Sequence, residues 1–189
     1  MSTNQQFFTN SHQPPANNLF LIGMMGSWKS TVGKKLAASL NMEFIDTDDE
    51  IEEMTEMKVA DIFAEFGEAK FREMESAYFV EKAKQNGILF STGGGIVLNE
   101  KNRKVLKENG KTILLDANAK TLAQRIHNTS KRPLLKSSDN LEARLQSIRE
   151  ERHPLYLECA HLIVETNTLE PPQVVNSILT LLENPVENY

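Results

Sequence analysis

Cysteines and long apolar runs are scarce in this sequence of 189 residues. A single cysteine, Cys159, cannot form an intrachain disulfide, so a reducing cytoplasm is compatible with the fold. No apolar run approaches the ~20 residues that cross a bilayer. Residues 1–17 contain no lysine or arginine and no long apolar core, which excludes the pattern of a signal peptide. We therefore expect a cytoplasmic protein without a membrane partner, preceded by a disordered tail over residues 1–17.

Positively charged residues are also fewer than negatively charged ones. The chain has 21 Lys and Arg against 26 Asp and Glu, a net charge of −5. Non-specific binding to a phosphate backbone needs a basic face, so we expect no nucleic-acid partner. A local arginine cluster can still bind a small anion. The hydrophobic fraction of 40% is typical of one globular domain, which we place at residues 18–184, followed by a short tail at 185–189.

The most informative motif is the segment Gly23-Met24-Met25-Gly26-Ser27-Trp28-Lys29-Ser30. It matches the phosphate-binding pattern G-x-x-x-x-G-K-[ST] except at Trp28, where the pattern has glycine. An apolar strand precedes it and a helical pattern follows it, which is the context that this loop requires. Backbone N–H groups and the helix N-terminus would bind phosphates, Lys29 would reach the transferred phosphate, and Ser30 would ligate Mg²⁺.

Short apolar segments alternate with helical patterns along the rest of the chain, which predicts a parallel α/β sheet. We expect strands at Leu19–Ile22, Glu43–Ile45, Ile88–Ser91, Thr112–Leu115 and Leu162–Val164. We expect helices at Lys29–Leu40, Val59–Phe66, Glu68–Asn86, Asn99–Asn109, Asn118–Asn128, Leu141–Leu157 and Pro172–Leu182. Gly67 divides two of these helices, and Gly87 and Gly110 are expected at helix C-termini.

A polar, basic segment over residues 129–139 interrupts this alternation. It is either a solvated loop or a mobile lid that brings Arg132 over the phosphates.

Two carboxylates and a glycine run follow predicted strands. Asp46 and Asp48 stand two residues apart at the end of the second strand, so a strand period would place them on one side. They either organise magnesium and a substrate hydroxyl or favour the start of the next helix. After the third strand, Gly93-Gly94-Gly95 either exposes N–H donors to an anion or only makes a tight turn.

Four arginines are candidates for binding an anionic substrate, because the planar guanidinium matches carboxylates and phosphates. They are Arg72, Arg125, Arg132 and Arg152, each of which could equally be a surface residue. The four histidines show no spacing typical of metal ligands.

Together these motifs resemble the shikimate kinase family over about residues 18–183. The resemblance rests on the loop, on Phe44-Ile45-Asp46-Thr47-Asp48, on Gly67-Glu68 with Phe71-Arg72, and on the glycine run. It continues in Arg132-Pro133-Leu134-Leu135 and in Arg152-His153-Pro154-Leu155-Tyr156.

The resemblance implies the nucleoside-monophosphate-kinase-like P-loop fold: a five-stranded parallel sheet in the order 2-3-1-4-5 flanked by helices, with a lid at about 127–139. It implies transfer of the γ-phosphoryl group of ATP to the 3-hydroxyl of shikimate, on the route to chorismate and the aromatic amino acids, by a monomer that needs Mg²⁺. The catalytic residues would be Lys29, Asp48 and Arg132, and Ser30 and Asp46 would hold the metal. Nucleotide would bind at Gly23, Gly26, Ser27, Trp28, Lys29, Ser30, Thr31, Arg125, Arg132 and Pro171. Shikimate would bind at Asp48, Arg72, Gly93, Gly94, Gly95 and Arg152, with Glu75 supporting the arginines.

The chain departs from the family pattern at two positions. Leu169 stands where some members have an arginine near the adenine. Trp28 stands where the loop backbone is often in a conformation that bulky residues resist, at a cost on the order of 1–3 kcal/mol. Two other functions therefore stay open: a different small-molecule kinase such as a gluconate kinase, and a non-catalytic relative that binds shikimate or a partner without efficient ATP turnover.

Overall fold

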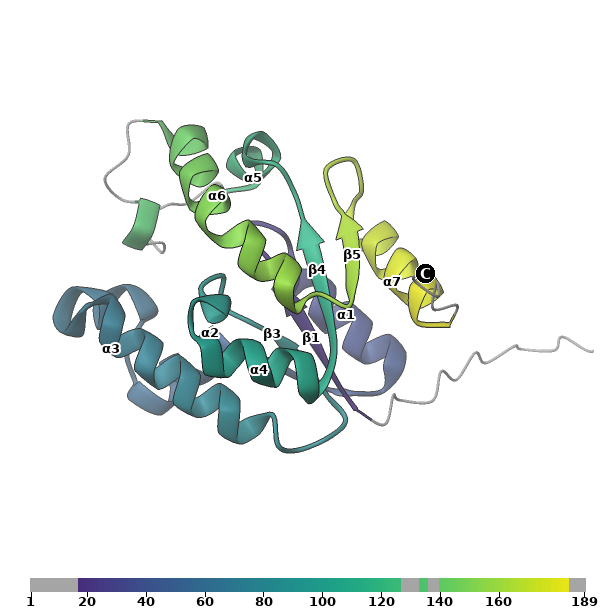
Figure 1. Cartoon of the computed structure of the whole chain (residues 1–189), viewed down its shortest axis with the longest axis horizontal. Helices are drawn as coiled ribbons and strands as arrows, with labels where there is room; N and C mark the ends of the chain where they lie inside the picture. The colour runs from purple at the N-terminus through teal and green to yellow at the C-terminus, as the bar shows by residue number, and fades with distance from the viewer. Residues whose placement is uncertain (1–16, 127–132, 136–139, 184–189) are drawn as a thin grey trace, which may run out of the picture.

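The molecule is a parallel sheet covered by helices on both faces (Figure 1). The computed structural model describes residues 17–126, 133–135 and 140–183. Within these ranges, five parallel strands lie in the order β2-β3-β1-β4-β5, which confirms the predicted fold class. The expected tails therefore lie almost entirely outside the described residues. So does the expected lid at about 127–139, apart from residues 133–135.

Strands and helices alternate along the chain as the sequence predicts, and one further helix, α2 (Thr47–Thr55), lies outside the expected helix ranges. The strands are β1 (Asn18–Ile22), β2 (Glu43–Asp46), β3 (Ile88–Ser91), β4 (Gly110–Asp116) and β5 (Leu162–Glu165). The helices are α1 (Lys29–Leu40), α2 (Thr47–Thr55), α3 (Val59–Lys82), α4 (Glu100–Glu108), α5 (Ala119–Arg125), α6 (Leu141–Cys159) and α7 (Pro171–Glu183). Two 3₁₀ turns complete the described part, η1 (Ile96–Leu98) and η2 (Pro133–Leu135).

The central strand β1 is buried along its whole length, and its side chains alternate between two cores. Phe20 and Ile22 pack beneath α3, α5 and α6 on one face of the sheet, where Phe20, Phe79 and Phe90 form an aromatic cluster. Leu19 and Leu21 pack beneath α1 and α7 on the other face. This alternation follows from the period of two along a strand that is covered on both sides.

The predicted division of α3 at Gly67 is confirmed. Gly67 has φ 80° and ψ 166°, so it interrupts the helix between Val59 and Lys82. Both predicted glycine caps are wrong. The helix ends at Ala83 in a right-handed conformation, before Gly87, and α4 ends at Asn109, so that Gly110 is already the first residue of β4.

The carboxyl ends of the five strands face the same edge of the sheet, where open α/β folds bind their ligands. The phosphate-binding loop follows β1 there, α2 begins directly after β2, and the glycine run follows β3. Residues distant in the sequence thus meet at one edge.

Candidate active site

Three adjoining cavities lie at this edge of the sheet, and we name them by what lines them. The phosphate cavity is lined by the loop, α1 and the carboxylates after β2: Met25, Gly26, Trp28, Lys29, Ser30, Thr31, Asp46, Asp48, Thr92, Gly94 and Arg125. The acceptor cavity is lined by Met25, Asp48, Val59, Phe63, Phe71, Arg72, Gly93, Gly94, Gly95, Leu134 and Arg152. The base cavity is lined by Trp28, Thr121, Gln124, Arg125, Asn167, Thr168, Leu169 and Glu170.

The loop after β1 has the backbone of a phosphate cradle. Gly26 has φ 82°, and Gly23 has φ 139° with its Cα so close to β4 that an added Cβ would stand 2.5 Å from the Leu115 carbonyl oxygen. The buried Lys29 ammonium donates to the carbonyl oxygens of Gly23 and Met24, both at 2.9 Å. These bonds hold the Lys29 side chain across the loop, at the wall of the phosphate cavity.

Trp28 has a left-handed backbone, with φ 69° and ψ 18°. This confirms the expectation that the position favours glycine, because a Cβ is unfavourable in this region. The Trp28 carbonyl nevertheless accepts the first helical hydrogen bond of α1, from Val32 N–H at 2.8 Å. The substitution therefore changes the space around the loop and its strain, while the helix N-terminus keeps its form.

Ser30 and Asp46 bring two hard oxygen ligands together at the phosphate cavity. The Ser30 hydroxyl donates to Asp46 Oδ2 at 2.6 Å. In the described part of the chain, no group of three or more His, Cys, Asp or Glu could hold a metal ion alone. This donor set fits Mg²⁺, which is usually held by one or two protein oxygens together with waters and substrate phosphates.

Two residues predicted for nucleotide binding support the loop from outside the cavities. Gly23 accepts from Lys29, and Ser27 is buried with its N–H bonded to the Met24 carbonyl at 3.2 Å.

Pro171 begins α7 just after Glu170 and is not among the residues that line the base cavity, whereas Leu169 is. Arg125 is held by the residue that follows β5, since it donates to the Thr166 hydroxyl at 3.0 Å and to the Thr166 carbonyl.

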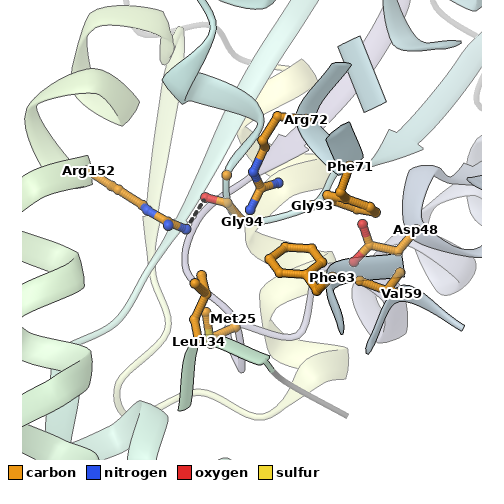
Figure 2. Close-up of a pocket in the computed structure, with 11 residues that line it drawn as sticks. Met25, Asp48, Val59, Phe63, Phe71, Arg72, Gly93, Gly94, Leu134 and Arg152 are labelled. Carbon is orange, nitrogen blue, oxygen red and sulfur yellow. Dashed lines mark hydrogen bonds between the residues drawn. The ribbon is translucent and has the colours of Figure 1, made fainter. Parts of the chain in front are cut away.

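The acceptor cavity combines an apolar floor with converging charges (Figure 2). Arg152 reaches in from α6 on one side, Asp48 lies on the other, and Arg72 points toward the glycine run between them. Arg152 Nη1 donates to the Gly94 carbonyl at 3.3 Å, and the buried Tyr156 hydroxyl donates to the same oxygen. Two guanidinium groups at one small cavity fit an anionic ligand.

Arg72 is fixed by its own helix. Its Nη1 donates to Glu75 Oε2 at 2.7 Å and its Nη2 pairs with Glu68 Oε1 at 3.2 Å. Its guanidinium also lies 5.1 Å from the centre of the Phe71 ring. Glu75 is buried, and this burial raises the pKa of its carboxyl although Arg72 and Arg152 act to lower it. The predicted support of the substrate arginines by Glu75 is therefore present in the geometry, at Arg72.

Two of the three glycines lie directly against the ends of charged side chains. A Cβ at Gly95 would stand closer than 3.0 Å to the Arg72 guanidinium, and a Cβ at Gly93 would stand closer than that to Glu75 Oε1 and Asp48 Oδ1. At Gly94 no atom would come closer than 3.4 Å. The run is therefore more than a tight turn, because it lets charged groups approach the backbone.

Asp48 is poised to exchange a proton near neutral pH. Burial, followed by the charges of Glu75 and Asp46, raises the pKa of its carboxyl to about 7, against the lowering effect of Lys29 and Arg72. Within the described residues, Asp48 Oδ1, Glu75 Oε1 and Arg152 Nε are buried atoms without a hydrogen-bond partner. Buried polar groups are nearly always paired, so these three atoms fit a site completed by a polar ligand.

The strand period predicted for Asp46 and Asp48 is wrong. Asp46 ends β2 and caps α2, where its Oδ1 accepts from Asp48 N–H at 3.2 Å, and Asp48 lies in the first turn of the helix. The helix-start interpretation is confirmed. The ligand-site interpretation stays a prediction, with Asp48 in the wall of both cavities.

Sequence reasoning missed the residues that complete the acceptor cavity. Val59, Phe63 and Leu134 line it, yet apolar residues at helical spacing look like ordinary core. The Thr47 hydroxyl accepts from Gly93 N–H at 3.0 Å and joins α2 to the glycine run, for which no sequence signal exists. Arg132 lies outside the described residues, so its place over the phosphates stays an expectation.

Comparisons with known proteins agree with this geometry. The family model described as shikimate kinase matches residues 25–183. A shikimate kinase of Burkholderia pseudomallei is 40% identical over 169 residues, which cover 89% of this chain and 91% of that protein. The solved structure of a shikimate kinase from Acinetobacter baumannii in complex with shikimate has a TM-score of 0.87 at 34% identity, covering 93% of this chain and 97% of that one.

The gluconate kinase alternative finds no comparable support. A gluconokinase from Sinorhizobium meliloti is 18% identical, with a TM-score of 0.55 and coverage of 93% of this chain and 96% of that one, a likeness that shows the shared fold alone. The chain therefore belongs to the shikimate kinase family.

Proposed function

We propose that this chain transfers the γ-phosphoryl group of ATP to the 3-hydroxyl of shikimate, forming shikimate 3-phosphate and ADP on the route to chorismate. As a member of the shikimate kinase family it is a phosphotransferase. The observation that carries the proposal is the position of Asp48, which lies in the wall of both the acceptor cavity and the phosphate cavity. At this position the Asp48 carboxyl would contact the hydroxyl of shikimate on one side and face the phosphates of ATP on the other.

The residues of the acceptor cavity bind and orient shikimate. Arg72 and Arg152 hold the shikimate carboxylate, and the buried oxygen of Asp48 accepts a hydrogen bond from the reacting hydroxyl. A carboxyl whose pKa is about 7 can take the hydroxyl proton as the new O–P bond forms. ADP leaves with the electron pair of the bond that breaks.

The residues of the phosphate cavity neutralise charge. Phosphoryl transfer depends mainly on positioning and electrostatic stabilisation, so the Lys29 ammonium and the α1 N-terminus face the transferring group. Ser30 and Asp46 would hold Mg²⁺, which supplies additional positive charge to the β- and γ-phosphates.

We further infer that the chain works as one domain over residues 18–184, as a cytoplasmic monomer. In support of one domain, the acceptor and phosphate cavities bring residues predicted for both substrates to one edge of the sheet. No helix among the described residues is long and apolar enough to cross a membrane. Light scattering coupled to gel filtration measures the oligomeric state, and a dimer mass would contradict the monomer.

The function is tested by measuring ADP release in a coupled spectrophotometric assay. Mass spectrometry then identifies the phosphorylated product. We expect turnover that depends on both shikimate and MgATP, and none when gluconate replaces shikimate. The absence of shikimate-dependent turnover, or equal turnover with gluconate, would overturn the proposal. Calorimetry with shikimate then separates a protein that binds it without turnover from one that does not bind it.

A further inference from the structure

The phosphate cavity and the base cavity share two lining residues, Trp28 and Arg125. These two side chains are in direct contact, with the Arg125 guanidinium carbon 3.3 Å from the centre of the Trp28 ring. The stacked pair therefore forms the partition between the two cavities. A nucleoside triphosphate is extended, so with its phosphates on the loop and its base in the base cavity, its middle has to pass this partition.

The stack leaves no room for a ligand between its members. Aromatic and guanidinium planes in contact already lie at van der Waals distance, and a base or ribose inserted between them would need about twice that separation. The Trp28 backbone is fixed by its bond to α1, so the indole cannot withdraw with the main chain. Arg125 is the member that can exchange partners.

Arg125 is hydrogen-bonded to neutral groups in this arrangement. Among the described residues it makes no ion pair, and its hydrogen bonds go to the neutral Thr166 hydroxyl and carbonyl. Partial burial lowers the pKa of Arg125, and the charge of Glu170 only partly offsets this effect. A phosphate oxygen is a stronger partner for guanidinium than an indole face, because charge-assisted hydrogen bonds exceed cation–π contacts at partly exposed sites.

We propose that Trp28 is an affinity-determining residue for the nucleotide in this chain, because its stack on Arg125 closes the passage between the two cavities and has to open when ATP or ADP binds. The proposal rests on the proposed function, since it takes the nucleotide as the ligand. In the bound state Arg125 turns from the indole to the nucleotide, and the indole loses its cationic neighbour. The stack thus competes with the nucleotide for one guanidinium.

The first experiment uses the chain's single tryptophan as its own reporter. The fluorescence of the full chain is followed during titration with MgADP in the absence of shikimate, so that no turnover is needed. N-acetyltryptophanamide at equal absorbance corrects for light absorbed by the nucleotide. We expect a saturable change in intensity and emission maximum, because the indole loses the guanidinium and gains solvent. Binding seen by calorimetry without any change in emission would overturn the proposal.

The second experiment measures MgADP affinity by calorimetry for Trp28→Ala and Trp28→Gly. Alanine keeps a Cβ on the left-handed backbone and removes only the indole, so the wild-type-to-Ala comparison isolates the stack. We expect Trp28→Ala to bind MgADP roughly two- to thirtyfold more tightly, the range that a lost cation–π contact of this class corresponds to. Unchanged or weaker binding would show that the indole does not oppose the nucleotide and would overturn the proposal.

The outcomes separate this proposal from the proposed function. If turnover depends on shikimate but Trp28 fluorescence does not change on MgADP binding, only the proposed role of the Trp28–Arg125 stack is rejected. A responsive Trp28 and tighter binding by Trp28→Ala, without shikimate turnover, reject the assigned reaction alone. If MgADP does not bind at all, both fall together.

Discussion

The acceptor cavity and the nucleotide side of this protein are stabilised in different ways. In the acceptor cavity the charged side chains are held by buried neighbours: Glu75 fixes Arg72, and the Gly94 carbonyl fixes Arg152. On the nucleotide side, a strained Trp28 stacks on an arginine that has no carboxylate partner in the described part of the chain. The difference indicates that packing fixes acceptor recognition tightly, while the nucleotide loop can take a costly substitution without losing its form.

The largest expected effect is on chemistry in the acceptor cavity. Asp48→Asn removes the group that takes the proton, so we expect kcat to fall about 10²–10⁴-fold. Stability should be unchanged or higher, because a carboxyl whose Oδ1 is buried without a hydrogen-bond partner is replaced by a neutral amide, which costs less to bury. Steady-state kinetics and thermal unfolding measure both.

The control for Asp48→Asn is Asp49→Asn. Asp49 is the next residue of the same helical turn, is exposed, and lines none of the three cavities. A kcat for Asp48→Asn within tenfold of that for Asp49→Asn would contradict the role of Asp48.

The next effect tests whether acceptor recognition is separate from nucleotide binding. Gly95→Ala places a methyl group against the Arg72 guanidinium and displaces it from the cavity. Loss of a charge-assisted hydrogen bond should raise the KM for shikimate roughly ten- to a hundredfold and leave the KM for ATP within about twofold. Equal increases in both constants would show that the two sides are not independent.

A smaller effect is expected on stability, where a buried and an exposed ion pair of the same spacing on α3 can be compared. Glu75→Gln weakens the buried pair with Arg72 and should lower the free energy of unfolding by about 1–3 kcal/mol. Glu73→Gln weakens the exposed pair with Lys70 and should cost less than about 1 kcal/mol. Urea unfolding gives both values, and equal losses would refute the account of a rigid acceptor side.

The smallest effect concerns the wall of the base cavity. Leu169→Ala removes part of a half-buried apolar surface, so the KM for ATP should rise about two- to fivefold while the KM for shikimate stays constant. Leu157→Ala, at an exposed position on α6 outside the three cavities, is the control. An increase in the KM for shikimate in Leu169→Ala would show that this wall serves the acceptor.

The sequence predicts the fold and most of the site because their signals are local. The loop, the alternation of strands and helices, and the break at Gly67 are each encoded within a few residues. All six residues predicted for shikimate binding line the acceptor cavity, since each belongs to a motif that the family resemblance covers.

What the sequence did not predict depends on contacts between distant segments. The stack of Trp28 on Arg125 joins the loop to α5, and no spacing rule connects them. Phe63 lines a cavity, although its periodicity is that of a core residue. The helix start at Asp46 was one of two interpretations of the sequence, but spacing alone could not show that this carboxylate also accepts from Ser30.

The central claim is that Trp28 weakens the nucleotide side and leaves the acceptor side intact. Its most direct test is a matrix of initial rates over shikimate and MgATP for the chain and for Trp28→Gly, which relieves both the left-handed strain and the stack. We expect the variant to lower the KM for ATP roughly two- to thirtyfold, as for loss of the stack, with the KM for shikimate unchanged within about twofold. An unchanged KM for ATP, or a shift of equal size in the KM for shikimate, would contradict the claim.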